Sequence, residues 1–295
     1  MKLNFLPCLV FMLGLCKAPT LLADPHQAWQ VWRAKYESSL TSHDGWLSLA
    51  GLYWLNPGIN TLGSAPTNQH RFPQHAPAHV GEIHVDEQTL LLKSALSELT
   101  INEQRLSQAV LRIDDPTRVK FGQFEFFLIE REQKLALRLI DHDSPNRRNF
   151  VGTRFFPFKH EALITGHLSP HPTPQIIQVA TVYGTTRNEQ SAGWIEFTIE
   201  GETQRLEAVD YGENSPLYLF FSDATSGHTT YPAGRYLQVD RADSNGQIMI
   251  DFNRSYNPPC AYTPYATCPL TPPQNRLKVP IIAGELDYSP PNSVK

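Results

Sequence analysis

Hydrophobic and polar positions along the chain follow two different periods. Trp29, Trp32 and Tyr36 recur at helical spacing near the N-terminus. Asp24 can cap a helix at its first turn, and Pro25 suits the first helical position. The pattern predicts one N-terminal helix whose aromatic stripe packs on the rest of the protein.

The remainder of the chain indicates β-structure. Short runs of β-branched, aromatic and leucine residues alternate with turn residues, and further helical patterns are scarce. The 24 prolines and 17 glycines make the sequence dense in turns. We expect an all-β fold, mainly an antiparallel β-sandwich or barrel, with one N-terminal helix. The predicted strands are 90–92, 110–113, 124–129, 135–139, 176–182, 195–199, 206–208, 217–221, 236–239 and 247–252.

Two turns are predicted between these strands. Residues 195–199 should pair with 206–208 through Glu200-Gly201-Glu202. Asn245 and Gly246 carry the strongest hairpin signal, because a two-residue turn with positive φ at both positions favours this dipeptide. We therefore expect the last two predicted strands to form a hairpin.

The polar segment DHDSPNRR, near the middle of the chain, has the composition of a surface linker and predicts a domain boundary. The expected organisation is a signal peptide (1–23), the helix (24–44), a β-sandwich domain (45–142) and a C-terminal β-domain (143–295) with a terminal loop rich in Pro, Tyr and Cys.

The N-terminus predicts export. Lys2 is followed by an apolar run up to Cys16, and Ala23 ends a plausible cleavage site. The run is shorter than a membrane span, so we expect a periplasmic or secreted protein without a transmembrane segment. A lipoprotein modified at Cys16 is the alternative, which the bulky Leu15 disfavours.

Charge and motifs exclude several function classes. The formal net charge is −4, and it becomes −6 when Lys2 and Lys17 leave with the signal. With no basic run, nucleic acid is not an expected partner. The sequence has no Gly-x-Ser-x-Gly elbow, P-loop, dinucleotide fingerprint or His-Glu-x-x-His motif, and we predict no cofactor and no metal. The binding partners that these observations leave open are a small-molecule ligand and another protein.

Two cysteines, Cys260 and Cys268, stay in the mature chain. In an oxidising compartment such a pair predicts a disulfide, which would contribute about 2.6 kcal/mol by closing a short loop. Cys260 as a reactive thiol is a second interpretation, although no histidine lies close before it in sequence. The spacing fits no zinc knuckle.

A candidate ligand pocket combines two polar segments. The stretch FFSDATSGHTTYPAGRYLQV gathers donors and acceptors between two strands, with Arg235 as a possible anion-binding group. Prolines stiffen the following YNPPCAYTPYATCPL loop, so it can present its side chains in fixed positions. The candidate ligand-binding residues are Arg235, Tyr231, Asp251, Asn253, Tyr256, Asn257 and Tyr262, and the candidate catalytic residues are Cys260, His228 and Asp223.

Two resemblances carry limited implications. The segments SHDGWLSLAGLYWLNPGINTLG and DFNRSYNPPCAYTPYATCPLTPPQNRLKVPIIAGE resemble a bacterial and archaeal family of unknown function, over essentially the whole mature chain. The run LNPGINTLGSAPTNQHRFP and the strands after it resemble a forkhead-associated domain, a phosphothreonine-binding β-sandwich. Gly63-Ser64 and Pro77-Ala78-His79 stand where that family has its phosphate-binding residues, so the resemblance implies the sandwich without phosphopeptide binding.

The working hypothesis is an exported protein that binds a small polar or anionic ligand, or a partner, in a pocket of the C-terminal β-domain. The alternative is a hydrolase-type enzyme that uses Cys260, or His228 with an aspartate.

Overall fold

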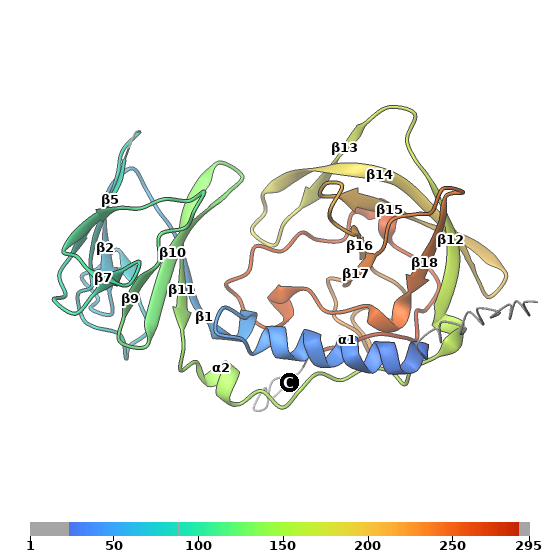
Figure 1. The fold of residues 1–295 in the computed structure, drawn as a ribbon, viewed down its shortest axis with the longest axis horizontal. Helices are drawn as coiled ribbons and strands as arrows, with labels where there is room; N and C mark the ends of the chain where they lie inside the picture. The colour runs from blue at the N-terminus through green and yellow to red at the C-terminus, as the bar shows by residue number, and fades with distance from the viewer. Residues whose placement is uncertain (1–23, 88, 289–295) are drawn as a thin grey trace, which may run out of the picture.

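The computed structural model describes residues 24–87 and 89–288. The predicted signal peptide, including Cys16, lies outside the described residues. Figure 1 shows two bodies: the strands up to Asp141 gather at one end of the molecule, and those from Leu163 onward gather at the other. Helix α1 (Pro25–Leu40) lies along the second body. The expected all-β fold with an N-terminal helix is confirmed.

Two sheets form the first body. One has the order β1-β11-β10-β9-β6-β7 and the other β3-β2-β4-β5-β8, and all pairs are antiparallel except β2 with β3. Their facing side chains make one buried cluster that includes Ile83, Phe126 and Leu137. The strands are β1 (Leu49–Trp54), β2 (Gly58–Gly63), β3 (His70–Arg71), β4 (Gly81–Val85), β5 (Leu90–Ser94), β6 (Thr100–Ile101), β7 (Gln104–Arg105), β8 (Gln108–Val110), β9 (Val119–Phe121), β10 (Phe124–Arg131) and β11 (Lys134–Asp141).

Strand β11 has two buried faces. Leu137 and Leu139 enter the core between the two sheets, whereas Ala136, Arg138 and Ile140 alternate with them and are also buried. The second set therefore lies on the outer face of the sheet. Contact of that face with the rest of the protein explains why it is covered.

One curled sheet forms the second body. Its order is β17-β16-β15-β14-β12-β18, with β13 paired to β14, and its end strands β17 and β18 approach each other. The enclosed core includes Leu206, Leu219 and Phe252. The strands are β12 (Leu163–Ser169), β13 (Gln175–Ala180), β14 (Thr186–Ile199), β15 (Glu202–Asp210), β16 (Leu217–Phe221), β17 (Arg235–Val239) and β18 (Gln247–Asp251). Short helices connect or follow the strands: η1 (Trp46–Ser48), α2 (Pro145–Arg148), η2 (His160–Ala162), η3 (Phe252–Arg254), η4 (Pro259–Ala261) and η5 (Pro273–Asn275).

The hairpin predicted at Asn245 and Gly246 is wrong. Strand β18 pairs with β12 and not with β17, and only Gly246 of the two turn residues has a positive φ, +79°. The Asp243 carboxylate organises the turn by accepting from the backbone N–H groups of Asn245 and Gln247. The two-residue turn with positive φ at both positions instead joins β14 to β15 at Glu200 (+51°) and Gly201 (+82°), where pairing was also predicted.

Helix α1 forms as its sequence predicts. The Asp24 carboxylate accepts a hydrogen bond from the His26 backbone N–H at 3.2 Å, and Pro25 occupies the first turn. Trp29 is buried, and its indole N–H donates to the Asn253 carbonyl at 2.9 Å. The aromatic face of the helix is thereby fixed against the second body.

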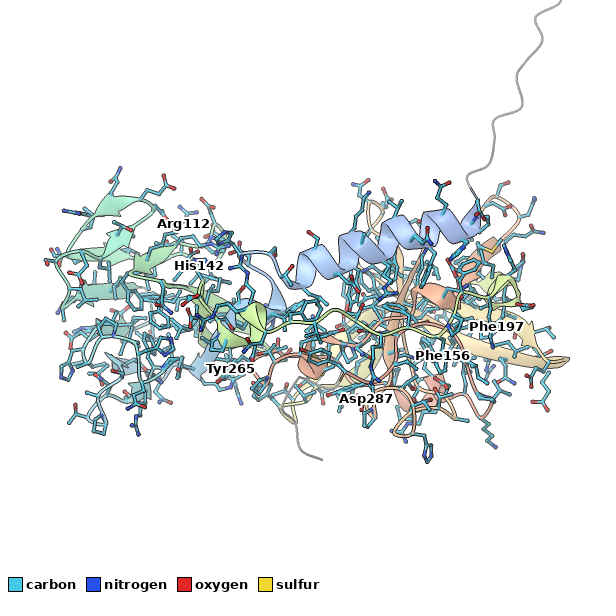
Figure 2. All side chains as sticks on the ribbon, turned by 90° about the horizontal axis from the view of Figure 1, so that it is seen from below. Arg112, His142, Phe156, Phe197, Tyr265 and Asp287 are labelled. Atoms are coloured by element: carbon cyan, nitrogen blue, oxygen red, sulfur yellow. The ribbon has the colours of Figure 1, made fainter. Side chains whose placement is uncertain are left out.

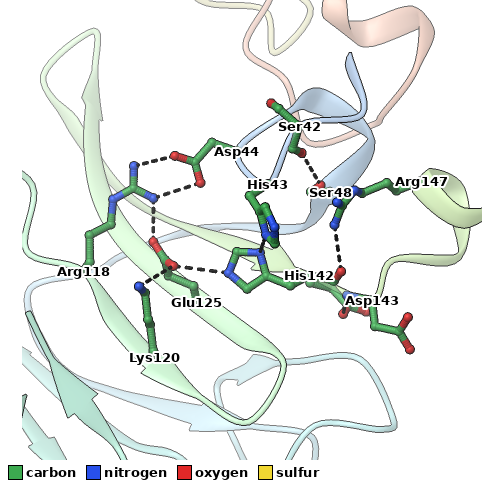
Figure 3. A network of polar contacts seen from close by, with 11 residues as sticks. Ser42, His43, Asp44, Ser48, Arg118, Lys120, Glu125, His142, Asp143 and Arg147 are labelled. Carbon is green, nitrogen blue, oxygen red and sulfur yellow. Dashed lines mark hydrogen bonds and ion pairs between the residues drawn. The ribbon is translucent and has the colours of Figure 1, made fainter. Parts of the chain in front are cut away.

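A polar network fixes the segment after α1 to the first body (Figure 3). Glu125, which is buried, binds Arg118 at 2.6 Å and His142 at 3.2 Å, and Arg118 also pairs with Asp44 at 3.1 Å. The His142 ring reaches His43 at 3.2 Å. These contacts position the chain that leads into η1 and Trp46.

The location of the tight turn gives a first prediction. We expect Gly201→Ala to lower the free energy of unfolding by about 1–2 kcal/mol, because alanine is strained at positive φ. Asn245→Ala should change it by less than about 0.5 kcal/mol, since Asn245 has an ordinary φ. Urea denaturation of both variants measures this difference, and equal effects would contradict the assignment.

Candidate functional site

The proline-rich loop lies against the β16–β17 hairpin. Tyr236 and Tyr256 exchange backbone hydrogen bonds of 2.8 and 2.9 Å, and the Tyr236 hydroxyl donates to the Pro269 carbonyl at 2.6 Å. Thr271 donates to the Ala233 carbonyl at 3.1 Å. The two segments that the sequence combined are therefore in contact.

Arg235 does not point into a ligand pocket, contrary to expectation. It is fully buried; its guanidinium binds Asp223 at 2.8 Å and donates to the carbonyls of Ile281 and Ala283. Burial lowers the pKa of Arg235, and the Asp223 carboxylate opposes that shift. The pair fixes the C-terminal segment to the sheet. Among the described residues only Nε of the guanidinium lacks a partner, and it is buried out of reach of a ligand.

The predicted dyad of His228 with an aspartate does not form either. Asp223 is buried, and its Oδ1 accepts from Thr225 and from the Ile281 backbone N–H. His228 is exposed, and within the described residues its ring makes no hydrogen bond or ion pair. The polar side chains between β16 and β17 form hydrogen bonds within that connection.

Three other predicted ligand residues use their side chains in hydrogen bonds within the protein, mostly to backbone groups. Asp251 Oδ1 accepts from the N–H and the side-chain amide of Asn253. Asn253 is buried and bonds both the N–H and the carbonyl of Lys159, at 2.9 Å each. Asn257, also buried, donates to the Leu286 carbonyl at 2.8 Å. These residues connect segments that are distant in sequence.

Glu285 is the centre of a buried cluster that includes the predicted Tyr262. Its carboxylate accepts hydrogen bonds from the hydroxyls of Tyr36 (3.0 Å) and Tyr262, and from the Asn257 backbone N–H (2.7 Å). Burial raises the pKa of Glu285 to about 7, although these donors oppose the shift. Burial and the carboxylate also raise the pKa values of both tyrosines. The cluster joins α1, the proline-rich loop and the C-terminal segment.

A pocket of about 320 Å³ opens beside this cluster, between α1 and the second body. Trp32 and Tyr36 stack at 5.5 Å between ring centroids, and Tyr256 lies 5.3 Å from Tyr36. Gln238 donates to the Tyr256 hydroxyl at 3.1 Å. The aromatic pocket is lined by Trp32, Lys35, Tyr36, Ser39, Leu40, Trp46, Gln238, Arg254 and Tyr256.

The charged residues that line this aromatic pocket are both cations. Lys35 is exposed and has no ion pair with any described residue. Arg254 pairs with Asp251 at 3.0 Å, and no carboxylate lines the pocket itself. Four aromatic rings with two cations can bind a flat ligand that carries an anionic group. Of the ligand residues predicted from sequence, only Tyr256 lies here.

Sequence reasoning missed the other aromatic residues of the pocket. Helical spacing put Trp32 and Tyr36 on one face of α1, which was interpreted as core packing. Both are only partly buried, because the second body covers one side of the stripe and leaves the other open. A stripe of large aromatic residues next to Lys35 was the available signal.

Cys260 and Cys268 are neighbours, as predicted, but the structure has no bond between them. Both are free thiols, Cys260 partly exposed and Cys268 buried. The Cys260 backbone N–H donates to the Cys268 sulfur at 3.1 Å, and the Tyr231 hydroxyl lies 3.8 Å from the Cys260 sulfur. In place of the predicted disulfide, the sulfurs take part in hydrogen bonds.

Comparison with known proteins gives a family without an assigned activity. Residues 148–286 match the family described as "Protein of unknown function (DUF1684)". The matched segment lies in the C-terminal half of the chain. The resemblance implied a match over essentially the whole mature chain, whereas the family match covers only residues 148–286. No curated protein matches the chain significantly.

Solved structures also match. An uncharacterised protein of Haloarcula marismortui, determined by NMR in solution, is 32% identical over 48% of this chain and 80% of that one, with a TM-score of 0.41. A forkhead-associated (FHA) domain from a study of phosphothreonine-dependent interactions is 19% identical, covering 31% of this chain and 95% of that domain, with a TM-score of 0.22. The FhaA FHA domain, complexed with the intracellular domain of Rv3910, is 20% identical, covering 30% and 96%, also at 0.22.

No helix in the described residues is long and apolar enough to cross a membrane.

The buried ion pair gives a second prediction. Asp223→Ala should lower the free energy of unfolding by about 3–5 kcal/mol, because it leaves the Arg235 charge buried without a partner. The matched control is Asp210→Ala, which removes a more exposed partner of Arg241 and should cost about 1 kcal/mol or less. Denaturant titration measures both, and a small effect at Asp223 would contradict the structural role.

Glu285 gives a third prediction. Its raised pKa means that the folded protein holds this proton more tightly than the unfolded chain does. Its contribution to stability is therefore greatest below about pH 4.5 and is lost as the pH rises through about 7. We expect the difference in unfolding free energy between the wild type and Glu285→Gln to change over this window. Glu202→Gln, at an exposed position, is the control for loss of a carboxylate elsewhere on the surface.

Proposed function

We propose that the protein binds a small anionic molecule with a flat apolar part in the aromatic pocket. The observation that carries this proposal is the composition of the pocket: four aromatic rings and two cations, with no carboxylate. Its volume of about 320 Å³ is at the lower end of the range of small-molecule sites. An anionic group would contact Lys35 and Arg254, while a ring of the ligand would lie against Trp32 or Tyr256.

The rigidity of the pocket walls supports binding. Tyr36 is held by Glu285 and Tyr262, and Tyr256 is held by its backbone bonds to Tyr236. Walls that are already fixed lose little conformational entropy when a ligand binds. A surface of mobile side chains would lose more.

A second cavity, of about 250 Å³, fits such a ligand less well. It lies at η2 and is lined mostly by aliphatic residues such as Ile164 and Ile281. Lys159 is accompanied there by two glutamates, Glu161 and Glu200, so its charge does not favour an anion. This cavity serves as a control site for binding experiments.

Export is part of the proposal, because the sequence of residues 1–23 is typical of a signal peptide. The family match and the pocket are equally compatible with other locations. N-terminal sequencing of the protein recovered from its native host tests this: a chain that begins at Asp24 supports export.

The fourth prediction uses 8-anilinonaphthalene-1-sulfonate, a flat aromatic anion, as the probe. We expect it to bind the native protein, and Lys35→Met should weaken binding at least about fivefold, because a charge contact of about 1 kcal/mol is lost. Trp32→Ala should weaken binding by more, since it removes the stacking surface. Fluorescence titration gives the dissociation constants.

Three controls make this test specific. Lys278→Met removes an exposed charge elsewhere and should leave binding unchanged. The uncharged analogue N-phenyl-1-naphthylamine should bind more weakly and be insensitive to Lys35→Met. If Ile164→Thr, in the second cavity, abolishes binding while Trp32→Ala does not, the assignment to the aromatic pocket is wrong.

A further inference from the structure

The two thiols of the proline-rich loop form a second, separate site. Cys260 lies on η4, which follows Pro258 and begins at Pro259, and it is partly exposed. Cys268 is buried, and its backbone is fixed by the hydrogen bond that its carbonyl accepts from the Val182 N–H at 3.1 Å. One thiol is therefore accessible, and the other lies behind it within hydrogen-bonding distance of Cys260.

Their surroundings make the two thiols chemically unequal. The hydrogen bond from the Cys268 thiol lowers the pKa of Cys260, and the Tyr231 hydroxyl and the Cys260 N–H act in the same direction against burial. The hydrogen bond to Cys260 and burial raise the pKa of Cys268. Of the two sulfurs, the accessible one therefore ionises more readily, as an attacking thiol requires.

A buried cation accompanies the pair. Arg138 is only 8% exposed, and its guanidinium has no hydrogen bond or ion pair with any described residue. Its guanidinium lies 5.5 Å from the centre of the Trp46 ring. Burial lowers the pKa of Arg138 to about 10, Arg131 adds to the shift, and negative charge at Cys268 or Tyr183 opposes it. A buried guanidinium without a carboxylate favours negative charge in the thiol pair, and its electrostatic contact with the pair is at Cys268.

The loop carries these thiols to the junction of the two bodies. Tyr183, from the second body, donates to the Pro264 carbonyl at 2.9 Å, and Tyr265 is labelled at this junction in Figure 2. Arg138 comes from β11 of the first body. The site is thus assembled from both bodies and from the loop between them.

We propose that Cys260 and Cys268 are a reactive dithiol that exchanges with small-molecule disulfides, with Cys260 as the attacking thiol and Cys268 as the resolving thiol. The Cys260 thiolate attacks one sulfur of a disulfide RSSR, forms a mixed disulfide and releases RS⁻, which takes up a proton. Cys268 loses its proton and attacks the Cys260 sulfur, so a Cys260–Cys268 disulfide forms and the second RS⁻ leaves. The small disulfide is reduced to two thiols, and the protein dithiol is oxidised.

The fifth prediction tests this with oxidised glutathione and intact-mass spectrometry. The full chain is used with Cys8→Ser and Cys16→Ser, so that only the pair can react. We expect a product two hydrogens lighter than the reduced chain, with two glutathione thiols released per protein and no lasting adduct. Cys268→Ser should keep one glutathione on Cys260, and Cys260→Ser should react at least about tenfold more slowly, because Cys268 is buried.

Several outcomes would overturn the proposal. A lasting adduct on the parent chain would show that Cys268 does not resolve it. Equal rates for the parent and Cys260→Ser would remove the assigned nucleophile. Absence of any reaction would make the pair structural. None of these results bears on the aromatic pocket, because the glutathione experiment uses no ligand of that pocket.

The surroundings of the thiols are tested by the pH dependence of iodoacetamide alkylation at Cys260. Tyr231→Phe removes one hydroxyl donor and should slow alkylation at pH 7 at least about threefold, with the midpoint moved to higher pH. Arg138→Met should act in the same direction, whereas Arg112→Met, at an exposed position, should not. An unchanged midpoint of the alkylation pH profile in both variants would contradict the assigned role.

The titratable or charged groups that face the pair are Arg138, Tyr183, Tyr231 and Tyr236, with Asp287 beyond Tyr231.

Discussion

The hydrogen bonds to the Glu285 carboxylate hold together three parts of the chain that are distant in sequence. Tyr36 comes from the N-terminal helix, Tyr262 from the proline-rich loop, and Glu285 from the C-terminal segment. A buried carboxyl group is costly unless donors surround it, so the three segments must arrive together for the cluster to be satisfied. The position of α1, and with it one wall of the aromatic pocket, depends on this cluster.

The proline-rich loop contributes to both proposed sites because of where it lies. Its first residue, Tyr256, lines the aromatic pocket, and its cysteines lie at the junction of the two bodies. Prolines limit the backbone conformations of the free loop, so less entropy is lost when it is fixed in place. Its tyrosines supply apolar area, and the Tyr262 hydroxyl donates to the buried Glu285 carboxylate. Stiffness and aromatic content therefore serve one purpose, which is to hold side chains in position between larger elements.

Much of the local structure followed from the sequence. The start of α1, most strands and the pairing of β14 with β15 were predicted, because helix capping and β-propensity act over a few residues. The Asn245–Gly246 hairpin failed for a tertiary reason: closure of the curled sheet pairs β18 with β12, and the Asp243 side chain satisfies the turn. The predicted ligand-binding role of Arg235 was wrong for a similar reason. Its charge pointed to a ligand, but the side chain is fully buried and its two terminal nitrogens bind Asp223 and two distant carbonyls.

The sequence by itself determined the fold class, the helix and the stiff, tyrosine-rich loop, since each rests on periodicity or on backbone restrictions carried by the residues themselves. Only the tertiary structure decided which polar groups are used up internally and which remain available. Trp32, Lys35 and Arg138 look ordinary in the sequence, whereas Arg235 looks functional. Their roles depend on burial and on partners contributed by distant segments, and neither quantity is a property of a residue and its sequence neighbours.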